Sequence, residues 1–184
     1  GSVSHIAQRL QVSGDLGIKA VDGPVGGTGD TATYRYNAGG QVVGVIAPDP
    51  DGTGSLKQAA TRLTYNEDGQ VTLSESGYVA GTSDTDWAGF TVDTVVETTY
   101  DDFGRPATSS QISTDGTTRY SLVQYGYDEA GRPDCTALRM NVTSTSTTLP
   151  TDVCEGMTAT SGNEDRISKR YYDQADRVTE VWAG

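Results

Sequence analysis

The sequence of 184 residues has little of what catalytic, metal-binding and membrane-spanning proteins depend on. It contains two Cys, two Met, two Phe, two Trp and a single His. No stretch approaches the roughly 18 consecutive apolar residues of a membrane helix. Basic residues are also scarce, because 13 Lys and Arg stand against 25 Asp and Glu, for a formal charge of -12. Binding to nucleic acid or to an anionic membrane needs a basic surface, so we expect neither partner.

The shortage of histidine and cysteine also argues against most kinds of catalytic and metal-binding site. A Ser-His-Asp or Cys-His arrangement has only His5 to use, and His5 lies close to the first residue. Two cysteines, Cys135 and Cys154, cannot complete a four-ligand zinc site. The stretch "DPDGTG" (49–54) begins like a calcium loop but has Ala60 at the twelfth position, where an acidic ligand belongs. We therefore expect no catalytic residue, no metal ion and no cofactor.

Glycine and tyrosine, by contrast, are plentiful, and many of them belong to a repeated heptad. Five segments of seven residues share one pattern. Each has a tyrosine first, an Asn or Asp second, two variable residues, a fifth residue that is usually Gly, a polar sixth residue and an apolar seventh. The copies are "YNAGGQV" from Tyr36, "YNEDGQV" from Tyr65, "YDDFGRP" from Tyr100, "YDEAGRP" from Tyr127 and "YDQADRV" from Tyr172. Such a repeat indicates one supersecondary unit used several times.

The heptad has the chemistry of a β-hairpin turn. In the second copy, Asn66 suits the first position of a type I turn, and Gly69 suits the position with positive φ that ends it. Tyr65 should then face Val71 across the two strands, as an aromatic against a β-branched residue. The residues that this reading assigns to the repeat are Tyr36, Gly40, Tyr65, Gly69, Tyr100, Gly104, Tyr127, Gly131, Tyr172 and Asp176. Asp176 replaces the expected glycine, so we expect a strained or altered turn there, or a frayed last repeat.

These hairpins predict an all-β fold, an antiparallel hairpin array in which tyrosines tile one face of an elongated or curled sheet. We divide the chain into 1–2, which resembles the scar of a cleaved tag, an N-terminal strand and loop segment at 3–33, and the repeats at 34–184 with an insertion at 135–165. The only passable helical stretches are "SLKQAATRL" (55–63) and "TALRMN" (136–141). Single hairpins are marginal in water, so we expect them to depend on their neighbours.

The pattern Y-[ND]-x-x-G-[RQ]-[VP] resembles the YD repeat of the RHS family, and its matches run from residue 34 to 180. The resemblance implies a section of a hollow shell wound from β-hairpins, in an exported or cell-surface bacterial protein that delivers a toxin. The implied partners are the neighbouring repeats of the parent chain, an enclosed C-terminal toxin domain and surface glycans. It implies no enzyme activity for this section. The stretch from Tyr127 through both cysteines to Tyr172 also resembles a two-cysteine segment of bacterial RHS proteins.

Two pairs of residues leave alternatives open. Cys135 and Cys154 either form a disulfide, which an exported protein permits, or remain two buried thiols. A disulfide would close the Ser/Thr-rich loop at 141–152. Trp87 and Trp182 either pack the sheet or, with exposed tyrosines, stack on sugar rings. The second choice defines a carbohydrate-binding surface module as the alternative to a structural section, and an enzyme is the least favoured class.

Overall fold

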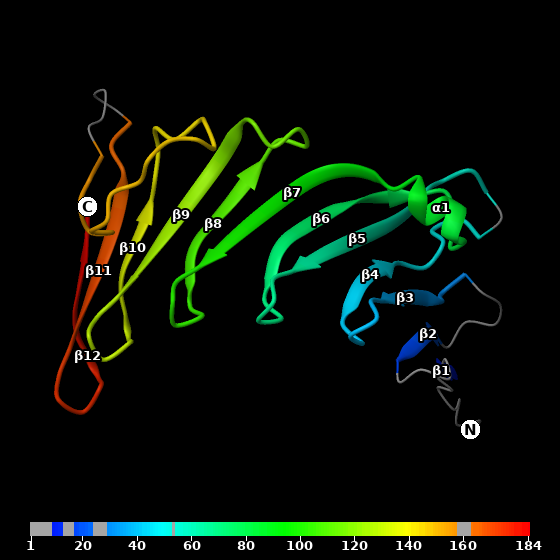
Figure 1. The fold of residues 1–184 in the computed structure, drawn as a ribbon, viewed down its shortest axis with the longest axis horizontal. Coiled ribbons are helices and arrows are strands. Elements are labelled where there is room, and N and C mark those ends of the chain that lie inside the picture. The colour runs from blue at the N-terminus through cyan, green and yellow to red at the C-terminus, as the bar shows by residue number, and fades with distance from the viewer. Residues whose placement is uncertain (1–8, 13–16, 24–28, 53, 158–162) are drawn as a thin grey trace, which may run out of the picture. The chain divides into compact units, whose positions relative to one another are not determined.

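The computed structural model describes residues 9–12, 17–23, 29–52, 54–157 and 163–184 (Figure 1). The chain divides into two compact units, Gly1–Thr94 and Val95–Gly184. Within each unit, strands that follow one another in the sequence are neighbours in an antiparallel sheet. The all-β fold class and the hairpin array predicted from the sequence are therefore confirmed.

The first unit contains the strands β1 (Arg9–Val12), β2 (Ile18–Asp22), β3 (Ala32–Tyr36), β4 (Val42–Ile46), β5 (Gln58–Tyr65) and β6 (Val71–Val79). A short helix, α1 (Asp84–Ala88), follows β6. Strand β7 (Thr91–Tyr100) begins in this unit and ends in the second. The second unit continues with β8 (Pro106–Ile112), β9 (Arg119–Tyr127), β10 (Pro133–Leu138), β11 (Arg166–Tyr172) and β12 (Val178–Ala183). In the part of the chain that the structure describes, no helix is long and apolar enough to span a bilayer.

Both helical expectations are wrong, because residues 58–63 of the first stretch and 136–138 of the second lie in strands. Gln58–Tyr65 pairs along its whole length with β6, and Pro133–Leu138 pairs with β9 and β11. Alanine favours helices only weakly, and pairing with strands on both sides outweighs that preference. The observed helix α1 instead begins at a capping box, in which Ser83 and Asp86 satisfy each other's backbone N–H groups.

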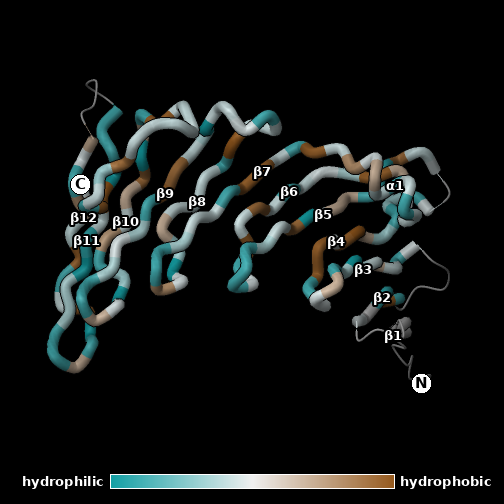
Figure 2. The backbone as a smooth tube through the Cα atoms, viewed as in Figure 1, coloured by the Kyte–Doolittle hydropathy of each residue, from teal (hydrophilic) through white to brown (hydrophobic). Residues whose placement is uncertain are grey.

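A small apolar core supports the first unit. Ile46, Ala60 and Val79 are buried together on one face of the sheet, and Trp87 and Phe90 pack against them. Figure 2 shows brown, apolar stretches on β4 and between β6 and β7, whereas the turn between β5 and β6 is teal. Helix α1 thus covers this face of the sheet by packing Trp87 against the buried cluster.

The second unit has a comparable core on the face of β10 and β11. Cys135, Ala137 and Ile167 are buried there, and Val153 and Cys154 from the long β10–β11 connection pack against them. The alternation of β10 puts Cys135 and Ala137 on one face, two residues apart. The connection therefore covers this part of the sheet and serves as a second layer over its buried face.

The five heptads form the same turn. The first residue of each turn accepts a backbone hydrogen bond from the N–H three positions on, at 2.8 to 3.2 Å. The residues with positive φ in these turns are Gly40 (79°), Gly69 (78°), Gly104 (77°), Gly131 (82°) and Asp176 (59°). The register pairs Tyr65 with Val71, as expected from the sequence, and the other four tyrosines with the corresponding Val or Pro.

A second irregularity follows each turn and was not expected from the sequence. After Tyr65 pairs with Val71, Thr64 pairs with Leu73, so that Thr72 is an extra residue on the returning strand. The same shift occurs in the other four heptad hairpins. A bulge bends its strand and increases the local twist, so each hairpin repeats one bend at one place.

The adjacent glycines of the first turn allow a matched test of the turn geometry. Gly40 has a φ of 79°, whereas a Cβ on Gly39 would meet only the side chains of Asn37 and Gln41. We expect Gly40→Val to lower the free energy of unfolding by about 1–2 kcal/mol, because a β-branched residue is strained in the left-handed region. Gly39→Ala should be neutral or slightly stabilising, since Ala130 occupies the equivalent place. Urea unfolding measures both, and equal losses would contradict the assigned turn.

Candidate functional site

In each turn, the second residue of the heptad binds the sixth through its side chain. Asn37 accepts the N–H of Gln41 at 3.0 Å and donates its amide to the Gln41 side chain at 2.7 Å. Asp128 likewise accepts the N–H of Arg132 at 2.9 Å and pairs with its guanidinium at 2.6 Å. The copies with Asn carry Gln and the copies with Asp carry Arg, so each pair is matched in charge. The two polar positions of the heptad are therefore one interaction that closes the turn.

Between hairpins, the tyrosine of one copy reaches the backbone of the copy before it. The hydroxyl of Tyr65 donates to the carbonyl of Val42 at 2.7 Å. The hydroxyls of Tyr127 and Tyr172 donate to the carbonyls of Pro106 (2.9 Å) and Pro133 (2.7 Å). In all three cases the acceptor is the seventh residue of the preceding heptad. The tyrosine thus joins consecutive hairpins near their turns.

The arginine of the preceding copy stacks on the same tyrosine. The Arg105 guanidinium lies 4.1 Å from the centroid of the Tyr127 ring, and that of Arg132 lies 4.6 Å from the Tyr172 ring. Such stacking contributes about 0.5–1 kcal/mol at an exposed site. A Cβ on Gly131 would lie 3.3 Å from Nη1 of Arg105, which shows how close this arginine comes to the next turn. We call the tyrosine-to-carbonyl bond and the arginine-on-tyrosine stack together the turn ladder.

The aspartates that pair with these arginines are stabilised in their ionised form. The hydrogen bond from Arg132 lowers the pKa of Asp128, and the bond from Arg105 lowers that of Asp101. Burial, followed by the Asp101 carboxylate, raises the pKa of Tyr127. The raised pKa keeps Tyr127 in the protonated form that donates to the carbonyl of Pro106.

The last turn keeps the common geometry although Asp176 replaces glycine. The Asp176 N–H donates to the carbonyl of Asp173 at 3.2 Å, as glycine does in the other copies. The carboxylate of Asp176 accepts a 2.6 Å ion pair from Arg132 of the preceding hairpin. Of the three expectations, an altered turn and a frayed repeat are not observed, whereas the backbone strain is present as a φ of 59° at a residue other than glycine. The ion pair with Arg132 gives the side chain a partner that offsets this strain.

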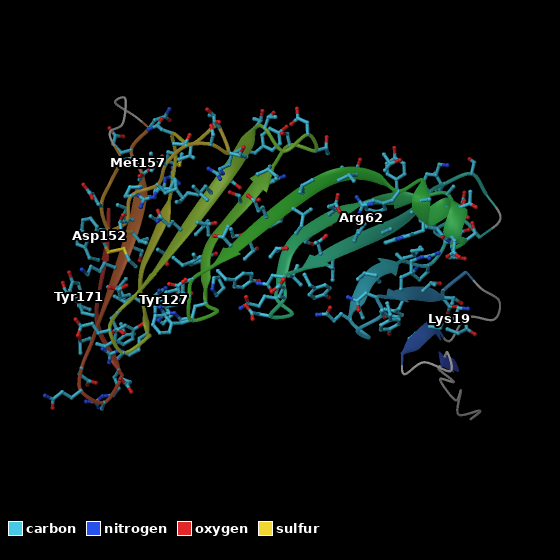
Figure 3. All side chains as sticks on the ribbon, viewed as in Figure 1. Lys19, Arg62, Tyr127, Asp152, Met157 and Tyr171 are labelled. Atoms are coloured by element: carbon cyan, nitrogen blue, oxygen red, sulfur yellow. A yellow bond between two sulfur atoms is a disulfide. The ribbon has the colours of Figure 1, made fainter. Side chains whose placement is uncertain are left out.

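The connection between β10 and β11 is fastened by a disulfide. Cys135 and Cys154 are bonded, with their Cα atoms 5.8 Å apart, and the yellow bond is visible near Asp152 in Figure 3. Of the two alternatives left open by the sequence, the structure has the disulfide. The chain-entropy model puts its contribution at about 3 kcal/mol for a loop of this size.

A buried arginine fastens the same connection and was not identified from the sequence. The side chain of Arg139 is 0% exposed and donates to Asp165 at 2.8 Å. It also donates to Gln124 and to the carbonyls of Val153 and Glu155, on both sides of Cys154. Asp165 accepts in addition the N–H groups of two methionines, Met140 and Met157. A signal was present in the sequence, because Arg139 continues the alternation of Cys135 and Ala137 on a buried face and so needed a partner.

The two tryptophans proposed for sugar stacking lie in different environments. Trp87 is half-buried against the core of the first unit, and Arg35 lies 5.2 Å from its ring centroid. A Cβ on Gly44 would meet the Trp87 ring at 2.5 Å, so the ring covers the sheet directly. Trp182 on β12 is 52% exposed. Trp87 therefore packs the fold, and the carbohydrate-binding alternative gains no support from it.

Across the described ranges, no group of three or more His, Cys, Asp and Glu is gathered in a way that could hold a metal ion. The one histidine, His5, lies outside the described residues. The described side chains instead act on one another, through the turn ladder and the Arg139 cluster, which we define as Arg139, Asp165 and Gln124.

No protein-family model and no curated protein matches the chain. Several solved structures are similar to it over 96% of its length. They include the Photorhabdus luminescens Tc holotoxin pore, at 13% identity and a TM-score of 0.47. They also include TcdB2–TccC3 without its hypervariable C-terminal region, at 14% identity, and TcdB2–TccC3, at 13% identity, both with a TM-score of 0.47. The chain spans 9% of the length of each of these chains.

The Arg139 cluster should carry much more stability than an exposed ion pair of the same chemistry. We expect Arg139→Met to lower the free energy of unfolding by about 3–5 kcal/mol, since Asp165 would be left buried and unpaired. The matched control is Arg177→Met, because Arg177 pairs with Asp173 at 2.7 Å but is 79% exposed. The control should cost about 1 kcal/mol or less. Denaturant titration measures both, and similar losses would contradict the structural role of the cluster.

Acid should weaken the same cluster. Burial alone would raise the pKa of Asp165, but the hydrogen bonds from Met157, Arg139 and Met140 outweigh it, and the pKa lies below its ordinary 3.8. A carboxylate whose pKa is lowered by folding stabilises the protein above its unfolded pKa, and this contribution is lost as pH falls through the folded value. We expect the unfolding free energy to decline below about pH 4, less steeply in Asp165→Asn. An unchanged slope in the variant would contradict this assignment.

Amide exchange provides a check that does not depend on the variant. In the unmodified protein, the N–H groups of Met140 and Met157 donate to Asp165. As the pH falls, these two amides should lose their protection against hydrogen exchange, corrected for intrinsic rates, at a higher pH than the amides of β9. Simultaneous loss of protection in both places would mean that Asp165 does not control the connection.

Proposed function

We propose that this chain is a structural section of an RHS-type shell, from an exported or toxin-delivering bacterial protein, with no catalysis of its own. The observation that carries the proposal is the turn ladder. Each step of the ladder uses two hairpins: the tyrosine-to-carbonyl bond recurs with the same atoms in three copies of the heptad, and the arginine stack recurs in two. Interactions of this kind build a wall from repeated units, not a pocket around a ligand.

The small cores support the same proposal. Among the described residues, the buried cluster of each unit has three members on its sheet, with two more residues packed against it. Hairpins with so little core depend on pairing with their neighbours for stability. The disulfide further suits a protein that reaches an oxidising compartment.

The net charge also fits a wall better than a binding module for an acidic ligand. With a formal charge of -12 the chain stays soluble and repels anionic surfaces. The carboxylates of Asp101, Asp128 and Asp173 each form an ion pair with the arginine of their own turn. By the family resemblance, the enclosed partner would be a C-terminal toxin domain of the same parent protein.

Electron microscopy of the complete protein that contains this section tests the proposal directly. We expect a hollow particle with the heptad hairpins in its wall. A short epitope tag inserted after the exposed Thr148 and an antibody fragment against it would locate the section. The antibody fragment should lie on the wall. A compact particle without a lumen, or label on an appendage outside the wall, would contradict the proposed function.

A further inference from the structure

The two sulfur atoms of the disulfide differ in their access to solvent. Cys135 lies on β10, is 2% exposed and is covered by the connection between β10 and β11. Cys154 lies on that connection and is half-buried, and its neighbours Asp152 and Glu155 are exposed. Thiol–disulfide exchange begins when a thiolate attacks one of the two sulfurs, and it needs access to that sulfur. An external thiolate therefore attacks Sγ of Cys154, and Cys135 is the leaving group.

The segment that carries Cys154 is also held by bonds that do not involve sulfur. Arg139 donates to the carbonyl of Val153 at 3.0 Å and to that of Glu155 at 2.6 Å. These two carbonyls come directly before and after Cys154 in the chain. The guanidinium is itself fixed by the other two members of the Arg139 cluster. Reduction of the disulfide removes one covalent bond and none of these contacts.

The hydrogen bonds from Arg139 close almost the same loop as the disulfide. The disulfide joins residues 19 positions apart, and the two hydrogen bonds join residues 14 and 16 positions apart. Closing a loop costs conformational entropy, and this cost is small once a nearby contact has closed the loop already. The cluster therefore holds the two sulfurs at a high effective concentration. Because such coupling is reciprocal, the cluster favours the disulfide by the same free energy by which the disulfide favours the cluster.

We propose that Cys135–Cys154 is a reversible redox latch and that Arg139 is its positioning residue. A dithiol reductant supplies two electrons and two protons. Its first thiolate forms a mixed disulfide with Cys154, while Cys135 leaves as a thiolate and takes up a proton. Its second thiolate then displaces Cys154, which is protonated in turn, and the reductant becomes a cyclic disulfide. The reduced connection stays on the sheet through the Arg139 cluster, so an oxidised dithiol restores the same bond by the reverse steps.

The latch lets this part of the chain pass between oxidising and reducing surroundings without uncovering its buried cluster. Ala137 and Ile167 lie beneath the connection, beside Cys135. Disulfides form in oxidising compartments, and cytosolic thiols keep cysteines reduced. Because docking of the connection does not require the S–S bond, these apolar side chains stay covered in both states. This role of the connection goes beyond the shell and does not depend on it.

Redox titration tests the positioning role of Arg139. The protein is equilibrated with mixtures of reduced and oxidised dithiothreitol and alkylated in denaturant, and mass spectrometry gives the oxidised fraction. We expect Arg139→Lys to lower the equilibrium constant for disulfide formation roughly tenfold, which raises the midpoint potential by about 30 mV. The reason is that a single ammonium cannot replace the planar fork that binds two carbonyls and Asp165 together. Asp165→Asn should shift the potential in the same direction by a smaller amount.

The control for general destabilisation is Gly40→Val, which strains a turn in the first unit. It should leave the potential unchanged, because the oxidised and the reduced chain are both folded. An equal shift in this control would mean that reduction unfolds the chain, and it would overturn the latch. An unchanged potential in the two cluster variants would overturn it as well.

Hydrogen exchange of the reduced, unmodified protein tests whether the connection stays docked. The N–H of Met157, which is labelled in Figure 3, donates to Asp165 at 3.0 Å and reports on the far side of the cluster. We expect reduction to change its protection by less than about tenfold, and reduction of Arg139→Lys to remove most of it. Complete loss of Met157 protection on reduction of the unmodified protein would contradict the proposal, because the disulfide alone would then hold the connection.

Discussion

A tyrosine hydroxyl that donates to the backbone of the preceding hairpin is the interaction on which the repeat depends. It ties Tyr65 to Val42, Tyr127 to Pro106 and Tyr172 to Pro133. A net hydrogen bond of this kind contributes about 0.5–1.5 kcal/mol, and the arginine stack adds to it at two of the three steps. The contribution is small for one step but recurs along the chain. The turn, the strand register and the bulge all serve to bring one tyrosine to one carbonyl.

The turns could be predicted from the sequence because their chemistry is local. Asn66 and Gly69 determine the backbone of a seven-residue segment, and the pairing of Tyr65 with Val71 follows from it. The target of the Tyr172 hydroxyl could not be predicted in the same way, since Pro133 lies 39 positions away. Local preference also gave a wrong prediction at residues 55–63. Ala59 and Ala60 favour a helix by themselves, but in the structure they pair with β6.

The connection between β10 and β11 shows the same limit for the second unit. Two cysteines indicated a possible bond, but nothing local indicated that Arg139 would bind the carbonyls on both sides of Cys154. The disulfide and the arginine hold the same short segment against β10, one by a covalent bond and the other by five hydrogen-bond donors in a fixed plane. Both attachments lie on this long connection, and the hairpins on either side of it keep the common turn.

The central claim is that the tyrosine hydroxyls join neighbouring hairpins, and removal of single oxygen atoms tests it most directly. The measurement is the unfolding free energy of Tyr127→Phe, Tyr172→Phe and the control Tyr120→Phe, whose side chain is 66% exposed on β9. The ladder predicts a loss of about 0.5–1.5 kcal/mol for each of the first two and almost none for the control. Three indistinguishable values would contradict it.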